Sequence, residues 1–276
     1  MQKVIKLALA FTVSTGMFAT TAFGDFSYTT TRKTTGGAMA AMAGTAANVT
    51  ARVYLKGQKM KVEDGNIATL MDFDAQTITT VNNARKTISV RSFSDLSGTS
   101  GASDIRIDAK ETGQRKTING FDARELLLTM EMDMSQGRGM AGKMQMEVDM
   151  WISSAVPGAG EMKAFYAKNS GRFPWTAMAG GDKNMQAAMA EVQKRIAAMD
   201  GVPVEQIIRV KPAVAAAGGA SMPQMPQMTG ARGGAASGNS SSLIEITADS
   251  AEFSTAGIAD AVFAAPAGYT KSEGKQ

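Results

Sequence analysis

The stretch LLLTMEMDMSQGRGMAGKMQMEVDMWI, residues 126–152, constrains the fold of this chain more than any other part of the sequence. Apolar and polar residues alternate along both of its arms, and this period of two predicts two antiparallel strands joined by a turn. A helix would distribute the same side chains around its circumference, whereas a strand pair separates them onto two faces. The apolar face is predicted to carry Leu126, Leu128, Met130, Met132, Met134, Met144, Met146, Val148, Met150 and Ile152, and the polar face Glu131, Asp133, Glu147 and Asp149.

The apolar face of this hairpin needs a cover, because each large apolar side chain gains roughly 1.5–3 kcal/mol when it leaves water. Helices, a second sheet or a ligand would provide that cover. The apolar spacing of residues 182–199 predicts a helix with a single apolar stripe, and an amphipathic helix of this kind can cover the apolar face of a sheet. The stripe consists of Met185, Ala188, Met189, Val192, Ile196 and Met199.

Most of the remaining sequence predicts short strands separated by turn residues, which is the pattern of an antiparallel meander. Asn119-Gly120 gives the strongest hairpin signal, because Asn and Gly both adopt the positive φ that a tight turn requires. Residues 161–169 predict a short helix. The predicted strands lie within residues 26–30, 49–55, 58–63, 66–71, 77–81, 86–90, 105–112, 114–118, 204–210 and 243–253.

Three segments without periodic apolar residues are predicted to be flexible hairpin tips, at residues 36–47, 135–143 and 213–242. They are rich in small and polar residues, so they have no apolar face to bury. We interpret them as loops within one domain, residues 25–276, because the mature chain is long enough for one sizeable core.

The first 24 residues have the features of a secretory signal peptide, with Lys3 and Lys6 before an apolar core and a small-x-small cleavage site at residues 22–24. Removing this segment leaves 27 basic and 25 acidic side chains, a net charge of +2 that is too balanced to indicate a nucleic-acid partner. No second apolar run approaches the roughly 20 residues of a membrane helix. We therefore expect a soluble periplasmic or secreted protein without a transmembrane segment.

The chain contains no Cys and no His. Their absence excludes disulfides, thiol nucleophiles and Cys/His zinc sites, and it removes the commonest general base of enzymes. No paired acidic residues lie within a recognisable catalytic motif. We therefore expect that the protein is not an enzyme and that it uses no cofactor.

Five short segments together carry a family resemblance: VYLKGQKMKVED (53–64), MDFDAQTITTVNNARKTISV (71–90), TINGFDA (117–123), DGVPVEQ (200–206) and VFAAPAGY (262–269). They resemble a family of exported bacterial proteins, classed as a domain of unknown function, whose shape is similar to the LolA-type lipoprotein-carrier half-barrel. This chain has Ala123 where the family often has a cysteine. The resemblance implies a mainly β (α+β) fold, in which a curved antiparallel sheet or half-barrel encloses one or two helices around an apolar interior.

The resemblance to lipoprotein carriers also implies an acyl ligand and no catalytic residues. The Met-rich strand face suits such a ligand, because Met side chains are flexible and repack around guests of different shape. The alternative is an ordinary core that faces the helix of residues 182–199. The candidate ligand-binding residues are Leu128, Met130, Met132, Met144, Met146, Val148 and Met150.

A second candidate site is MPQMPQM, which places the thioethers of Met222, Met225 and Met228 at a spacing of three. Soft sulfur ligands favour Cu(I), so this segment is a candidate metal site in an exported protein. The alternative is composition bias, because the chain contains 21 Met residues. The acidic side chains of the central hairpin also allow two interpretations, a Ca²⁺ site or a solvated outer surface.

We expect from these patterns an exported soluble protein that binds or carries a hydrophobic molecule or acyl chain. The alternative is a structural or interaction protein whose partner is another envelope protein, with the Met-rich tips as contacts or Cu(I)-binding arms.

Overall fold

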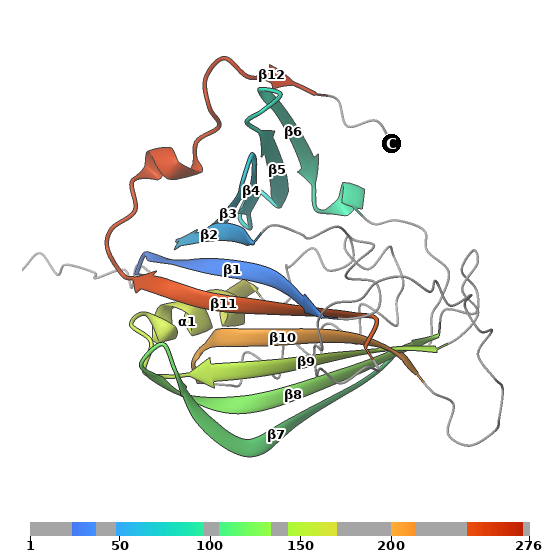
Figure 1. The fold of residues 1–276 in the computed structure, drawn as a ribbon. Coiled ribbons are helices and arrows are strands. Elements are labelled where there is room, and N and C mark those ends of the chain that lie inside the picture. The colour runs from blue at the N-terminus through green and yellow to red at the C-terminus, as the bar shows by residue number, and fades with distance from the viewer. Residues whose placement is uncertain are drawn as a thin grey trace, which may run out of the picture.

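A computed structural model describes residues 24–36, 48–96, 105–133, 143–169, 200–213 and 242–272. Within these residues the chain forms one curved, open, twelve-stranded sheet and one α-helix, α1 (Ala159–Asn169), which packs against the sheet (Figure 1). The fold is mainly β, as the sequence predicts. The strands are β1 (Phe26–Gly36), β2 (Val49–Lys56), β3 (Lys59–Asp64), β4 (Ile67–Asp72), β5 (Thr77–Asn82), β6 (Thr87–Ser92), β7 (Ile105–Ile118), β8 (Phe121–Asp133), β9 (Lys143–Ser153), β10 (Val202–Ala213), β11 (Ile244–Ser254) and β12 (Thr270–Lys271), and two short 3-10 turns are η1 (Ser94–Leu96) and η2 (Asp260–Phe263).

The strands lie in the order β12-β6-β5-β4-β3-β2-β1-β11-β10-β9-β8-β7. Every neighbouring pair is antiparallel except β12 and β6, which are parallel. Strands β2 to β6 form the predicted meander, and β10 and β11 pair as the predicted hairpin arms. β1, the first strand, pairs with β11 in the middle of the sheet, so segments from opposite ends of the sequence lie side by side there (Figure 1).

The central hairpin has the register that its sequence pattern predicts. Leu126 lies opposite Met150, Leu128 opposite Val148, and the backbone of Met132 opposite that of Met144. A slip by one residue would move every apolar side chain to the other face, so the alternating pattern fixes this register strongly. The turn before β8 is also as predicted, with positive φ values of 51° at Asn119 and 83° at Gly120.

The main core lies between α1 and one face of the sheet, which we call the inner face. Phe165 of α1 meets Phe73 edge to face, with ring centroids 5.5 Å apart, and Phe26 stacks on Phe253. Such aromatic pairs add to the stabilisation from burial itself. The buried cluster to which these aromatic side chains belong consists of Phe26, Val53, Leu55, Phe73, Ala123, Trp151, Val156, Ala159, Met162, Phe165, Val202 and Val204.

A smaller cluster of Ala68, Val81 and Ile88 lies on the opposite side of β4 to β6, because alternation turns these side chains away from the inner face. The C-terminal segment reaches this region, where Tyr269 packs on the cluster and β12 pairs with β6. Phe263 in η2 is also buried.

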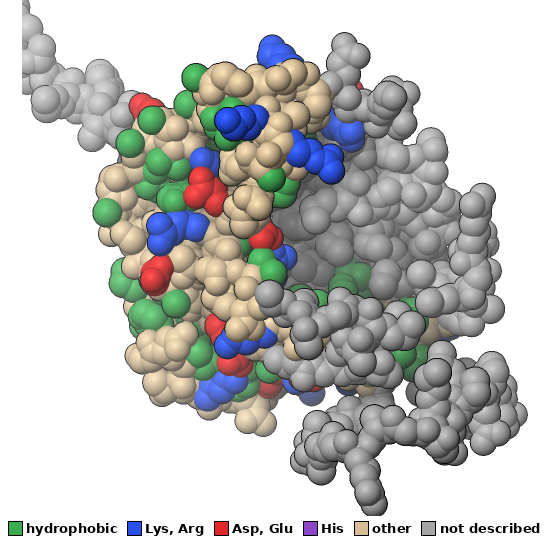
Figure 2. Space-filling view, turned by 45° about the horizontal axis from the view of Figure 1, so that its top comes forward, with side chains coloured by type: hydrophobic (Ala, Val, Ile, Leu, Met, Phe, Trp, Pro, Cys, Tyr) green, Lys and Arg blue, Asp and Glu red, His purple; other side chains and the backbone are tan. Residues whose placement is uncertain are grey.

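Several predicted segments lie outside the described residues. These are the helix of residues 182–199, residues 1–23, and the three predicted tips except for their end residues. The described part of the chain contains no helix that is both long and apolar enough to cross a membrane. On the face shown in Figure 2, basic and acidic side chains are interspersed over the described surface.

Candidate functional site

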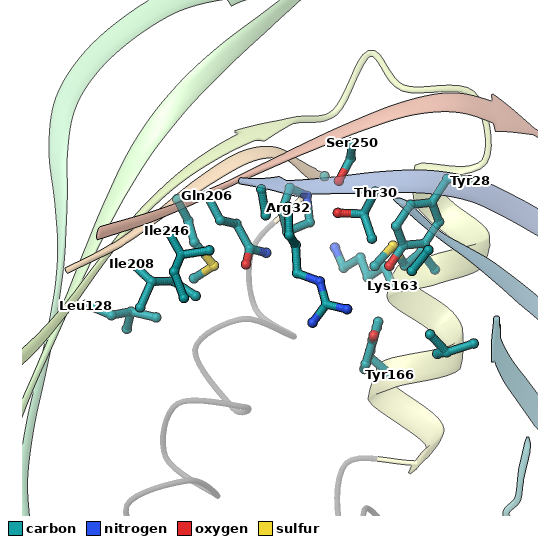
Figure 3. Close-up of a pocket in the computed structure, with 17 residues that line it drawn as sticks. Tyr28, Thr30, Arg32, Leu128, Lys163, Tyr166, Gln206, Ile208, Ile246 and Ser250 are labelled. Atoms are coloured by element: carbon teal, nitrogen blue, oxygen red, sulfur yellow. The ribbon is translucent and has the colours of Figure 1, made fainter. Parts of the chain in front are cut away.

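A cavity of about 460 Å³ lies between α1 and the inner face of the sheet (Figure 3). Its size falls within the range of about 300–1,000 Å³ that is typical of small-molecule sites. Strands β1, β2, β3, β8, β9, β10 and β11 and helix α1 all contribute to its walls.

One end of the cavity is apolar. Leu128, Ile208 and Ile246 lie side by side in Figure 3, and Met150 joins them in the lining. The register explains this grouping, because Ile208 pairs with both Val148 and Ile246 across β10, and Leu128 pairs with Val148 on its other side. Neighbouring strands therefore place branched and thioether side chains in one continuous apolar surface.

The other end carries the charged side chains. Arg32 extends from β1 and Lys163 from α1, so the two cations approach the cavity from different walls (Figure 3). These two are the charged side chains among the described lining residues, and both are basic. Each has a carboxylate partner outside the lining, since Arg32 pairs with Asp64 and Lys163 with Asp200.

These two ion pairs are exposed and weak. The side chains of Arg32 and Lys163 are 48% and 41% accessible to solvent, and exposed pairs contribute about 0–1 kcal/mol. The hydrogen bond from Lys163 holds the pKa of the Asp200 carboxyl below its ordinary value, so the pair is fully charged at neutral pH. A ligand anion can therefore compete for either cation at low cost.

Two tyrosines lie beside the cations. Burial raises the pKa of Tyr166 to about 12, and burial together with the nearby Tyr166 raises the pKa of Tyr28 well above its ordinary value. Both hydroxyls therefore keep their protons at physiological pH and remain able to donate hydrogen bonds. Figure 3 shows Tyr28 and Tyr166 at the same end of the cavity as Lys163.

The cavity includes part of the predicted ligand-binding set. Leu128 and Met150 line it, whereas Met130 is buried elsewhere on the same face and Val148 packs beside Leu128. Met144 and Met146 are half-buried and do not belong to the described lining, and of Met132 only the backbone is described. The predicted copper ligands Met222, Met225 and Met228 lie outside the described residues.

Sequence reasoning did not identify the polar lining residues. Arg32 continues the alternation of Phe26, Tyr28 and Thr30, so its position on the inner face could have been inferred from the pattern. Lys163 and Tyr166 stand three residues apart in α1, a spacing that places them on the same side of a helix.

Among the described residues, the outer face of the central hairpin differs from the prediction most clearly at Asp149. The sequence predicts a solvated acidic surface, but Asp149 is only 8% exposed. Glu125, Lys116 and Arg209 act on it electrostatically, and Trp151 on the same face of β9 is also buried. The neighbouring strands β8 and β10 flank Asp149 on both sides, and this tertiary crowding is absent from the local sequence pattern.

Comparison with known proteins assigns no family to these features. No protein-family model matches the chain, and no curated protein matches it. Function is therefore inferred from the cavity and from the side chains that line it.

Proposed function

We propose that this protein binds and carries a hydrophobic molecule with an acyl or similar chain in the cavity between α1 and the inner face. The observation that carries the proposal is an apolar cavity of about 460 Å³ that Leu128, Met150, Ile208 and Ile246 line at one end. Each methylene that leaves water contributes about 0.8 kcal/mol, so a chain of several carbons gains enough free energy to offset the cost of association.

The architecture supports the same proposal. A curved antiparallel sheet with a helix on its inner face is the arrangement that a LolA-type half-barrel requires, and the sequence resemblance points to such a carrier. We extend the proposal to the location, because the first 24 residues resemble a secretory signal. A carrier outside the cytoplasm needs no catalytic groups, which is consistent with a chain that lacks His and Cys.

The proposal is tested with N-phenyl-1-naphthylamine, an uncharged apolar dye that fluoresces when it leaves water. We expect saturable fluorescence with the purified protein. Ala248 lines the cavity, so Ala248→Trp should fill it and weaken dye binding by at least about tenfold, the equivalent of 1.4 kcal/mol.

Ala251→Trp is the matched control, because Ala251 lies on the same strand but lines a groove formed by side chains of the outer face, including Thr29 and Thr31. This variant should bind the dye as the wild type does. Absence of saturable binding to the wild type, or equal binding by both folded variants, would contradict the proposal.

A further inference from the structure

The polarity of the cavity is graded along a row of cross-strand neighbours. Met150 on β9 pairs with Gln206 on β10, Gln206 pairs with Ala248 on β11, and Ala248 pairs with Arg32 on β1. All four side chains line the cavity. The row therefore begins at a thioether, passes an amide and ends at a guanidinium.

The length of this row sets a scale for a ligand. Three strand spacings of about 4.8 Å separate Met150 from Arg32, which gives about 14 Å in total. An extended chain advances roughly 1.2 Å per bond, as the peptide backbone does with about 3.6 Å over three bonds. A molecule that reaches from one end of the row to the other thus contains about a dozen bonds.

The charged end selects the sign of the ligand's head group. Arg32 and Lys163 reach the cavity from two different elements, and the described lining contains no carboxylate. A cationic head would be repelled by both side chains, and an uncharged head would accept hydrogen bonds from them without neutralising their charge. An anionic head would accept charge-assisted hydrogen bonds from both.

We propose that the ligand is an anionic amphiphile, with a carboxylate or phosphate head bound by Arg32 and Lys163 and a chain that lies along Leu128, Met150, Ile208 and Ile246. This inference rests on the proposed function and adds the chemical class of the ligand. The planar guanidinium of Arg32 suits two-point contact with either head, and Lys163 adds a mobile point charge. Tyr28 and Tyr166 supply O–H donors at the same end.

The two carboxylates outside the lining make this inference specific. Without a ligand, Asp64 forms an ion pair with Arg32 and Asp200 forms one with Lys163, so an anionic head group must displace these carboxylates. Removing either carboxylate should therefore strengthen the binding of anionic amphiphiles and leave uncharged ones unaffected. A purely structural role for these ion pairs predicts no such gain.

The experiment measures displacement of N-phenyl-1-naphthylamine by four amphiphiles with the same twelve-carbon chain, each below its micelle concentration. They are dodecanoate, dodecyl phosphate, dodecanol and dodecyltrimethylammonium, and inorganic phosphate is the chain-free comparison. We expect at least one anionic amphiphile to bind about tenfold or more tightly than dodecanol, because a hydrogen bond to a charged group is worth roughly one decade in affinity or more. The preferred anion identifies the head group.

Variants then locate the effect. Arg32→Met and Lys163→Met should lose the preference for anions and keep dodecanol binding, whereas Asp64→Asn and Asp200→Asn should increase the preference. Arg115→Met is the matched control, because Arg115 forms a similar exposed pair with Asp122 on a strand that does not line the cavity. It should behave as the wild type does.

The outcomes separate the two proposals. If the wild type binds dodecanol as tightly as both anions, the head-group inference is wrong while a hydrophobic carrier remains supported. If the dye and all four amphiphiles fail to bind, the proposed function itself is wrong. If inorganic phosphate displaces the dye at the concentration at which dodecyl phosphate does, the site takes a small anion and the amphiphile is excluded. The wild-type comparisons decide these cases without any variant.

Discussion

Asp149 on β9 and Arg209 on β10 are diagonal neighbours, with Oδ2 and Nη1 3.9 Å apart, a separation too long for a hydrogen bond. Arg209 instead donates to Glu147 at 3.1 Å and to Glu245 at 2.9 Å. Oδ1 of Asp149 is buried without a hydrogen-bond partner. The guanidinium therefore stabilises the Asp149 carboxylate only partly, and an ionised Asp149 is costly in this position.

The pH dependence of stability follows from this arrangement. Burial, and then the negative charge of Glu125, raise the pKa of Asp149 to about 6, although Arg209 and Lys116 oppose the rise. A carboxyl whose pKa is raised on folding stabilises the native state below its unfolded pKa of about 3.9, and this contribution is lost as pH rises through about 6. A pKa difference of this size between the folded and unfolded chain corresponds to roughly 2–3 kcal/mol.

Asp149→Asn should remove this pH-dependent loss. The free energy of unfolding of the variant minus that of the wild type should increase by roughly 2–3 kcal/mol between pH 4 and pH 7. Urea denaturation of both proteins at a series of pH values measures this difference. Asp122→Asn is the control, because the hydrogen bond from Arg115 lowers the pKa of Asp122. It should show no gain with rising pH, and a curve for Asp149→Asn that runs parallel to the wild type would exclude a raised pKa at Asp149.

Gly158 permits the chain to enter α1 beside the aromatic core. Its φ is +82°, and a Cβ built on it would lie 2.7 Å from Cε2 of Phe26 and 2.8 Å from Cγ2 of Thr255. Gly158→Ala combines backbone strain with overpacking, so we expect a loss of at least about 2 kcal/mol in the free energy of unfolding.

Gly160 provides the matched control for that substitution. It lies two residues further along, within α1, and a Cβ there would meet nothing within 4 Å. Gly160→Ala should be neutral or should stabilise the protein by up to about 1 kcal/mol, since Ala has the higher helix propensity. Chemical denaturation compares the two variants, and equal losses would show that the entry to α1 is not constrained at Gly158.

Phe165 anchors α1 to the sheet. It is 2% exposed, and its ring lies 5.5 Å from that of Phe73 and 5.8 Å from that of Tyr166. Phe165→Ala should lower the free energy of unfolding by about 3–5 kcal/mol, because it removes buried area and leaves a void. Val90→Ala at a side chain that is 55% exposed should change it by less than about 0.5 kcal/mol.

The elements that the sequence predicts correctly are those with local signals. The register of β8 and β9 follows from strict alternation, and the turn at Asn119 follows from the conformational freedom of Asn-Gly. The position of α1 also follows from its own residues. Each of these features is determined within about thirty residues of chain, since hairpins and helices form from near neighbours.

The polar end of the cavity has no such local signal. Arg32 and Lys163 are far apart in the sequence, and they line the same cavity only because β1 pairs with β11 and α1 packs against the inner face. The burial of Asp149 likewise depends on neighbouring strands rather than on its own alternation. The polar lining of the cavity and the buried carboxyl of Asp149 are therefore the features that tertiary arrangement determines.

Ligand binding should stabilise the folded chain if the cavity is a binding site. A molecule that binds only the native state adds about 2.7 kcal/mol to the free energy of unfolding at a concentration of one hundred times its Kd. Dodecanoate at that ratio should raise the Tm of the wild type in differential scanning calorimetry. Ala248→Trp should show a much smaller rise at the same dodecanoate concentration, because its indole occupies the middle of the row between Gln206 and Arg32. Equal rises in both proteins would mean that dodecanoate binds elsewhere, since a filled cavity cannot supply the same free energy.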